Sequence, residues 1–134
     1  MPSALAMHRF EETMITTITF VKMQPGLSRD AFFDRWCEHT RDRDLRDHPE
    51  ISLNRLTMFE EGSEYLGMAE NHWPDRASLD AAIRWYEKPE GQAHQKDLES
   101  FMDMVNSPTV IVSHEVEVSS ERGIEWKARP GRTT

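Results

Sequence analysis

The stretch KMQPGLSRDAFFDRWCEH, from Lys22 to His39, joins the end of a predicted strand to a predicted helix. Pro25-Gly26 is a turn pair, because proline presets φ and glycine accepts a positive φ. Ser28 is a suitable N-cap, since its hydroxyl can accept a hydrogen bond from a free N–H group of the first turn. The stretch therefore predicts a strand, a tight turn and a helix that begins near residue 29.

The predicted helix has one apolar face. Phe32, Phe33, Trp36 and Cys37 recur at the spacing i, i+1, i+4, i+5, which is typical of a buried helix face. His39 follows Phe32 by seven residues, so it lies within about 20° of Phe32 around the helix axis. We therefore predict that His39 points along the apolar face, near the end where the core opens toward a loop.

The composition limits the class of protein. The chain has 134 residues and a net charge of −8, which fits one domain and disfavours nucleic-acid binding, because phosphate binding needs a basic surface. The sequence holds no apolar run of roughly 20 residues and no secretory signal at its N-terminus. The single cysteine, Cys37, allows no internal disulfide. These features predict a cytoplasmic protein that does not span a membrane.

The remaining chain alternates between strand and helix patterns. We predict an N-terminal extension at 1–13, a domain at 14–118, and a C-terminal arm or tail at 119–134. Within the domain we expect strands at 14–23, 51–60, 65–73 and 109–118, a helix at 29–42, a second helix opened by Pro74-Asp75, and a third helical segment after Pro89-Glu90-Gly91. This βαββαβ order, with an extra helix before the last strand, predicts an α+β, ferredoxin-like fold with a four-stranded antiparallel sheet.

One face of such a sheet would carry no helix. Two copies can cover these faces by pairing them, which closes a dimeric α/β barrel. We therefore expect a homodimer.

Several short motifs, in this order, resemble the EthD family over residues 14–118. The first three are Phe20-Val21-Lys22, the PGLS turn, and a helix with the pattern F-x-x-x-W-x-x-H at Phe32, Trp36 and His39. The resemblance continues through Tyr65-x-Gly67-x-Ala69-Glu70, Leu79-x-Ala81-Ala82, Pro89-Glu90-Gly91 and the apolar strand that carries His114.

The resemblance implies a dimeric α/β barrel and a pocket that contains the helix histidine, here His39. Members of the family include accessory proteins of cytochrome systems that degrade ethers, polyketide decarboxylases and cyclases, and lactone isomerases. The family often has His-Ala-Pro after this helix, whereas this chain has His39-Thr40-Arg41, so we expect a differently shaped loop.

His39 is the candidate catalytic residue. An imidazole with a pKa near neutrality can act as a general acid or base. The alternative is a structural histidine at the negative end of the helix dipole. Phe32, Trp36 and Trp73 are expected in the core, and they could also form the wall of a pocket for an aromatic ligand.

Four further residues are candidates for substrate binding. Phe20 and Lys22 share one face of the first strand, where Lys22 could stabilise an anionic oxygen or form an edge salt bridge. His72 shares a strand face with Glu70, either as a proton relay or as a polar pair. His114 is either a pocket imidazole or a histidine at the core or dimer seam. His8, His48 and His94 receive no predicted role.

The sequence contains no local motif for a metal or a nucleotide. It has no H-x-x-x-H, C-x-x-C, G-x-G-x-x-G or G-x-S-x-G, so we predict no metal and no cofactor. Two hypotheses follow. One is a cofactor-independent lyase, isomerase, decarboxylase or cyclase that acts on a small apolar, cyclic or aromatic metabolite, with His39 as general acid/base. The other is a non-catalytic, ligand-binding accessory protein of an oxidative degradation pathway.

Overall fold

A computed structural model describes residues 14–128, and the predicted extension at 1–13 lies outside them. Within this range, four strands form an antiparallel sheet in the order β2-β3-β1-β4. Their bounds are Ile15–Val21 (β1), Leu53–Met58 (β2), Gly67–Trp73 (β3) and Thr109–Ile111 (β4). The order and the antiparallel pairing confirm the predicted βαββαβ arrangement.

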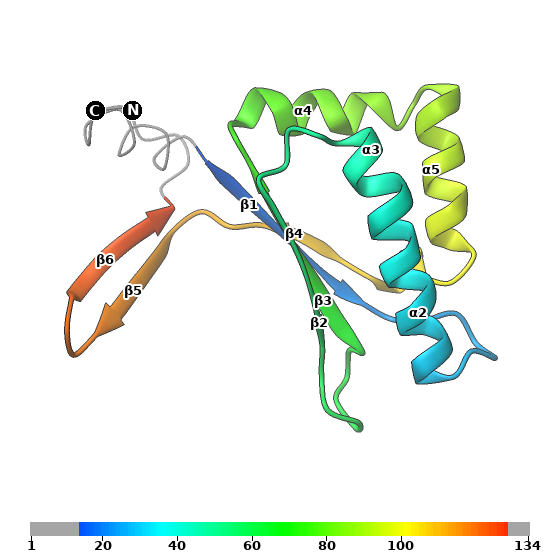
Figure 1. Ribbon diagram of the computed structural model, residues 1–134, viewed down its shortest axis with the longest axis horizontal. Coiled ribbons are helices and arrows are strands. Elements are labelled where there is room, and N and C mark those ends of the chain that lie inside the picture. Colours follow the sequence, from blue (N-terminus) through cyan, green and yellow to red (C-terminus); the bar gives the residue numbers. More distant parts are fainter. Residues whose placement is uncertain (1–13, 129–134) are drawn as a thin grey trace.

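The helices cover one face of this sheet, as Figure 1 shows. They are Arg29–His39 (α2), Leu45–Asp47 (α3), Arg76–Trp85 (α4) and Pro89–Glu99 (α5), with a π-helical turn at Thr40–Asp44 (η1) and a 3₁₀ turn at Met104–Asn106 (η2). We call the covered face the inner face and the opposite one the outer face.

Helix α2 begins where the sequence predicts. The hydroxyl of Ser28 accepts a hydrogen bond from the Ala31 N–H at 3.1 Å, and Gly26 has a φ of 92° in the preceding turn. The helical path does not stop near residue 42 as expected. It continues through η1, where the Leu45 N–H bonds the Thr40 carbonyl, and into α3. This turn is wider than an α-helical turn and shifts the register of the residues that follow.

The register of the sheet assigns each strand residue to a face. Directly opposite residues in an antiparallel pair share a face. Thr17 pairs with Asn71 and Thr19 with Ala69, and these residues lie on the inner face with buried Val21. Their neighbours along the strands therefore lie on the outer face, where Thr16 pairs with His72, Ile18 with Glu70, and Phe20 with Met68.

The core lies between the inner face and the helices. One buried cluster contains Val21, Phe32, Trp36, Phe101 and Met102, and a second contains Ile15, Trp73, Leu79 and Ala82. Phe32 and Phe101 meet edge to face with ring centroids 5.5 Å apart. Of the predicted helix face, Phe32 and Trp36 are buried, whereas Phe33 is 37% exposed and Cys37 is half-buried.

The predicted strand at 109–118 is wrong in its second half. β4 ends at Ile111, and a separate hairpin follows, made of Glu115–Ser119 (β5) and Gly123–Ala128 (β6). Val118 pairs with Ile124, so the position where we expected the domain to end lies inside a hairpin. The alternating valines do predict a strand, but alternation does not identify its partner.

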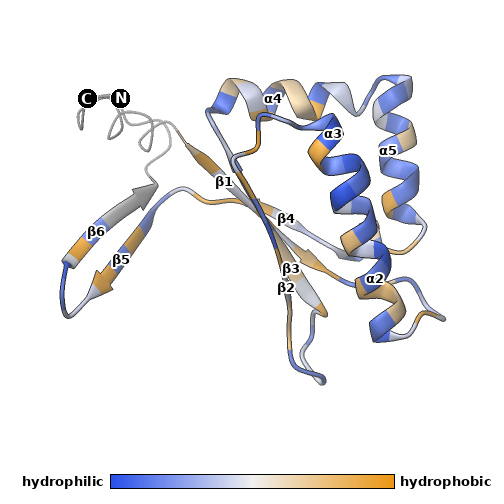
Figure 2. Cartoon of the chain, viewed as in Figure 1, coloured by the Kyte–Doolittle hydropathy of each residue, from blue (hydrophilic) through white to orange (hydrophobic). Residues whose placement is uncertain are grey.

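The hairpin extends away from the domain on the side opposite the helices (Figure 1). Figure 2 shows that hydrophobic and hydrophilic residues alternate along it. Val116, Val118 and Ile124 expose 45%, 68% and 70% of their surfaces. Within residues 14–128, no helix is long and apolar enough to cross a membrane.

Candidate functional site

A cavity of about 450 Å³ lies between the inner face and the helices. This volume is within the usual range for small-molecule sites. Its wall is mostly apolar and includes the residues Trp36, Ile51, Ala69, Trp73, Leu79, Ile83, Leu98, Met102, Met104 and Ile111. Nine polar residues complete the wall, so a ligand here would bury apolar surface and also meet several polar groups.

The polar part of the cavity wall comes from several elements. Asp44 comes from η1, His48 from the loop after α3, Tyr86 from the end of α4, and His94 from α5. Nε2 of His48 lies 2.8 Å from the hydroxyl of Tyr86. Asn71 also lines the cavity, and its Oδ1 is buried without a hydrogen-bond partner among the described residues. A ligand with a donor group would satisfy that oxygen.

Two histidines and one aspartate meet beside this cavity. Nε2 of His39 lies 3.2 Å from Nε2 of His94 and 3.3 Å from Oδ1 of Asp44. Nε2 of His94 lies 3.0 Å from the same Asp44 oxygen. We call His39, Asp44 and His94 the triad. Their three ligating atoms therefore face a common point.

Two other aspartates hold the remaining ring nitrogens of the triad. Nδ1 of His39 lies 2.6 Å from Oδ2 of Asp97, and Nδ1 of His94 lies 2.8 Å from Oδ2 of Asp47. Because a carboxylate only accepts hydrogen bonds, each Nδ1 carries a proton and donates it. Both rings are thus fixed in orientation.

The local sequence explains how the triad assembles. His39 ends the apolar face of α2. His94 precedes Leu98 by four residues on α5 and Phe101, just beyond that helix, by seven, so both histidines lie on buried helix faces. Asp44 follows His39 by five residues, a spacing that an α-helix would turn away by about 140°. The π-helical turn η1 brings Asp44 back to the same side.

Burial and charge act in opposite directions on the triad. Burial raises the pKa of Asp44, but hydrogen bonds from His39 and His94 outweigh it and hold this pKa well below its ordinary value. Burial lowers the pKa of His94, but Asp44 and Asp47 outweigh it, so the pKa of His94 lies above its ordinary value. The cluster thus favours a carboxylate at Asp44 and a positive charge on His94.

The outer carboxylates of the cluster have lowered pKa values. At Asp97, burial raises the pKa, but the hydrogen bonds with His39 and Arg35 outweigh it. At Asp47, burial likewise raises the pKa, and Arg46 and His94 outweigh it. Both side chains therefore stay ionised and can hold the histidine N–H groups.

His48 and Tyr86 differ from the triad because burial dominates their pKa values. Burial, and then the charge of His94, lowers the pKa of His48. Burial, and then the charge of Asp44, raises the pKa of Tyr86 well above its ordinary value. At neutral pH the imidazole is therefore neutral and the phenol keeps its proton.

The predicted site residues divide between the two faces. Trp36 and Trp73 line the cavity, whereas Phe32 is fully buried in the core behind it. His39 is 1% exposed and lines a smaller polar cleft rather than the apolar cavity. His94 lies between His39 and the cavity. The role of His39 as a general acid/base stays a prediction.

Phe20, Lys22 and His72 lie on the outer face of the sheet, away from the cavity. Nε2 of His72 lies 2.6 Å from Oε2 of Glu70 on the same strand, so the two side chains are in contact, and a substrate-binding role of His72 stays a prediction. His114 lies in the exposed segment between β4 and β5, and its Nδ1 is 3.1 Å from the Ser113 hydroxyl.

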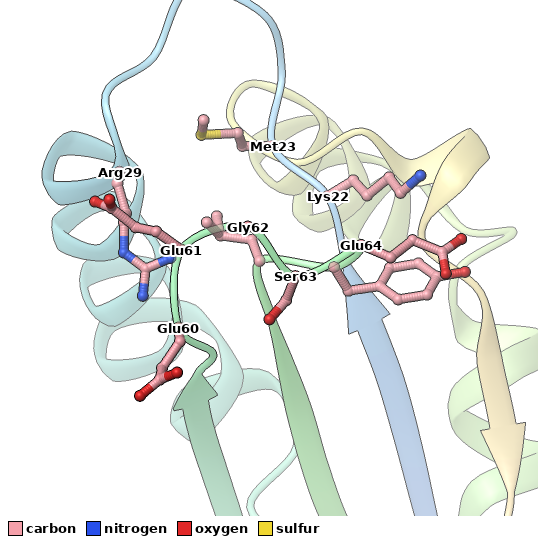
Figure 3. Close-up of a pocket in the computed structure, with 10 residues that line it drawn as sticks. Lys22, Met23, Arg29, Glu60, Glu61, Gly62, Ser63 and Glu64 are labelled. Atoms are coloured by element: carbon pink, nitrogen blue, oxygen red, sulfur yellow. The ribbon is translucent and has the colours of Figure 1, made fainter.

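Lys22 borders a separate pocket of about 380 Å³ formed by the loop 60–66. Figure 3 shows that Lys22 and Arg29 flank this loop, which carries Glu60, Glu61 and Glu64. The Lys22 ammonium lies 5.2 Å from the ring centroid of Tyr65, a cation–π contact. This pocket is more open than the inner cavity, and its lining is more charged.

Sequence reasoning missed Asp44, His48 and His94. For His94 a signal was present, because its spacing to Leu98 and Phe101 predicts a buried position. For Asp44 no such signal exists, since its place depends on the π-helical turn. His48 follows a three-residue helix, and its packing against Trp73 and Trp85, with ring centroids 5.6 and 5.2 Å away, arises only in the folded chain.

Comparison with known proteins finds similarity in structure. The sequence matches no protein-family model, and no curated protein matches it significantly. A hydroxynitrile lyase from Passiflora edulis has a TM-score of 0.56 and 11% identity, covering 76% of this chain and 93% of that one. A dimeric protein of unknown function and ferredoxin-like fold from Bacteroides fragilis has a TM-score of 0.53 and 11% identity, covering 74% and 94%.

This chain has the ferredoxin-like fold. An EthD-family protein from Bacillus halodurans is also among the matching structures, with 23% identity, a TM-score of 0.49, and coverage of 74% of this chain and 96% of that one.

Proposed function

We propose that this ferredoxin-like protein binds a small, largely apolar, cyclic or aromatic molecule in the inner cavity and transfers a proton to or from it. The observation that carries the proposal is the cavity of about 450 Å³, in which polar groups that include His48, Tyr86 and His94 lie among apolar wall residues. The proton transfer would serve a lyase, isomerase, decarboxylase or cyclase reaction.

His48 and Tyr86 are the groups best placed to exchange the proton. They are hydrogen-bonded at 2.8 Å, and both line the cavity. A neutral imidazole can accept a proton, and a protonated phenol can donate one to a ligand oxygen. The pair therefore contains a base and an acid in contact.

In this proposal His39 has an indirect role, because His94 lies between it and the cavity. Its ring is held by Asp97 and contacts His94, so it would orient His94 rather than touch the ligand. This modifies the sequence-based hypothesis, in which His39 itself exchanges the proton.

We also propose that two copies of the chain pair through their outer faces. Figure 1 shows no helix over this face in the described chain. Val110, opposite Ile18 on that face, is 45% exposed, and the β5–β6 hairpin adds the exposed apolar side chains of Val116, Val118 and Ile124. One structure with this fold is described as dimeric. A second copy would cover both apolar surfaces.

A ligand screen by thermal shift tests the cavity. Phenolic, polyketide-like and lactone compounds are the appropriate panel, and we expect at least one to raise Tm. Ala69→Trp, which fills the cavity from the inner face of β3, should abolish that rise. Ala81→Trp is the control, because Ala81 is exposed on α4.

Two results would change the proposal. If Ala69→Trp keeps the full thermal shift, the ligand binds elsewhere. If a compound binds in the cavity but no panel member is turned over, the non-catalytic, accessory function is favoured instead.

A further inference from the structure

We propose that His39, Asp44 and His94 form a binding site for a divalent transition-metal ion. The inference rests on the geometry of the triad alone and does not depend on the proposed chemistry in the cavity. It replaces the expectation from sequence that the protein binds no metal. That expectation came from local motifs, and these three ligands come from three separate elements.

The distances within the triad match those between ligands of one ion. The three pairs of ligating atoms are separated by 3.0, 3.2 and 3.3 Å. A metal ion with ligand bonds of about 2.0–2.2 Å holds neighbouring ligand atoms roughly 3.0 Å apart in octahedral geometry and roughly 3.4 Å apart in tetrahedral geometry. The triad atoms therefore already stand at coordination spacing.

The hydrogen bonds around the triad leave its three facing atoms able to act as electron-pair donors once the protons that the Nε2 atoms share with Asp44 are released. Asp97 and Asp47 each accept the Nδ1 proton of one histidine. A neutral histidine protonated at Nδ1 presents a lone pair at Nε2, and Asp44 presents a carboxylate oxygen. In the metal-free protein, protons between the Nε2 atoms and Asp44 offset the repulsion of three facing lone pairs, and a metal ion would displace those protons. A carboxylate on the second nitrogen is also the usual partner of a metal-bound histidine.

The ligands are held before any ion arrives. The side chains of His39 and His94 are 0% and 1% exposed, and both histidines belong to helices of the core. The His39 ring packs against Phe101, and the His94 ring against Trp85, with ring centroids 5.7 Å apart in each case. Such packing fixes the rotamers that coordination requires.

Two imidazoles and one carboxylate select a class of ion. This donor set suits Zn²⁺, Fe²⁺, Co²⁺ and related first-row ions, whereas Mg²⁺ and Ca²⁺ prefer oxygen ligands. Among residues 14–128, these three side chains are the group whose ligating atoms converge within 4.8 Å. Asp44 and His94 also line the cavity, so a bound ion would lie beside the proposed ligand site.

Metal binding is tested directly on the full chain, after chelator treatment and buffer exchange. We expect one Zn²⁺ per chain by calorimetry, and Co²⁺ to give visible d–d absorption from nitrogen ligation. Asp44→Asn and His94→Ala should lose this binding. Asp97→Asn should weaken it by about 10- to 100-fold, because it frees the His39 ring.

Matched controls separate this site from other carboxylates and histidines. Asp42→Asn removes an exposed aspartate paired with Arg41, and His72→Ala breaks the outer His72–Glu70 pair; neither should alter binding. No Co²⁺ absorption in the wild type would overturn the inference. The triad would then be held together by protons shared among His39, Asp44 and His94. Binding that survives Asp44→Asn but is lost in His72→Ala would also overturn the inference. Since the readout is metal binding, its failure leaves the cavity proposal intact.

Discussion

Similar pairs of side chains lie on the two sides of the sheet, in different surroundings. Each face has a histidine–carboxylate contact of 2.6 Å, His39–Asp97 near the inner face and His72–Glu70 on the outer face. On the inner side, the histidine is 0% exposed and belongs to a cluster with two further aspartates. On the outer side, the histidine is 22% exposed. The same pair of residue types thus lies in a buried network on one side and in a partly solvated contact on the other.

The two pairs differ in their burial and not in their residue types, so residue type alone does not identify a candidate site. Hydrogen bonds in a buried network are stronger and more costly to break than exposed ones. A substitution on the inner side should therefore have a larger effect than a similar substitution on the outer side.

The largest expected effect concerns turnover. With a compound that the wild type converts, Tyr86→Phe should lower kcat by about 10²- to 10⁴-fold, because it removes a proton donor from the cavity wall. His72→Gln on the outer face should leave kcat unchanged. Steady-state kinetics measure both. Equal kcat values for Tyr86→Phe and the wild type would show that the phenol takes no part in the reaction.

Stability should follow the same division. His39→Ala empties a buried position and removes the partner of Asp97 and His94, so we expect it to lower the free energy of unfolding by about 2–3 kcal/mol. His72→Ala should cost at most about 1 kcal/mol, since its contact with Glu70 is partly solvated. Urea denaturation of the chelator-treated protein provides both values, and similar losses in the two variants would remove the distinction.

Assembly is the expected role of the outer side. Val118→Asp together with Ile124→Asp puts charge on the apolar face of the hairpin, and we expect the dimer Kd to rise by at least about tenfold, or 1.4 kcal/mol. Glu117→Lys, on the opposite face of β5, is the control that changes charge without removing apolar surface. Sedimentation velocity at micromolar concentration gives the oligomeric state. A wild-type monomer would reject the proposed pairing.

The pH dependence of stability should be the smallest effect. The pKa of Asp44 is lowered, so the stability it contributes is present above the ordinary value of 3.8 and is lost as pH falls through its native pKa. The pKa of His94 is raised, so its contribution is present below 6.5 and is lost as pH rises through its native pKa. Without metal, Tm should therefore fall on both sides of a mildly acidic maximum. Asp44→Asn should flatten that profile in thermal scans, and an unchanged profile would count against the network.

The fold could be predicted from sequence because its signals are local. Ser28 and the Phe32–Trp36 spacing predicted the start and the buried face of α2. Alternation along the first strand predicted which residues lie on each face of the sheet, and it placed Lys22 and Val21 on opposite faces. The hairpin at β5–β6 was missed because alternating valines do not specify a pairing partner.

The candidate site was only partly predictable. Trp36 and Trp73 were expected near a ligand, and they line the cavity. His39 was expected to face inward, and it does, but its contacts with Asp44, His94 and Asp97 depend on a π-helical turn and on the packing of α2 against α5. These are tertiary contacts between residues up to 58 positions apart. Local spacing does not contain that information.

We propose that the ligand binds in the inner cavity and not on the outer face. Histidine ring signals in a ¹H–¹³C NMR titration test it most directly, using the compound from the thermal-shift panel that raises Tm most. We predict that the ring signals of His48 and His94 shift with saturation while that of His72 stays in place. A saturable shift of the His72 signal, with the His48 and His94 signals unchanged, would show that the ligand binds on the outer face and would contradict the proposal.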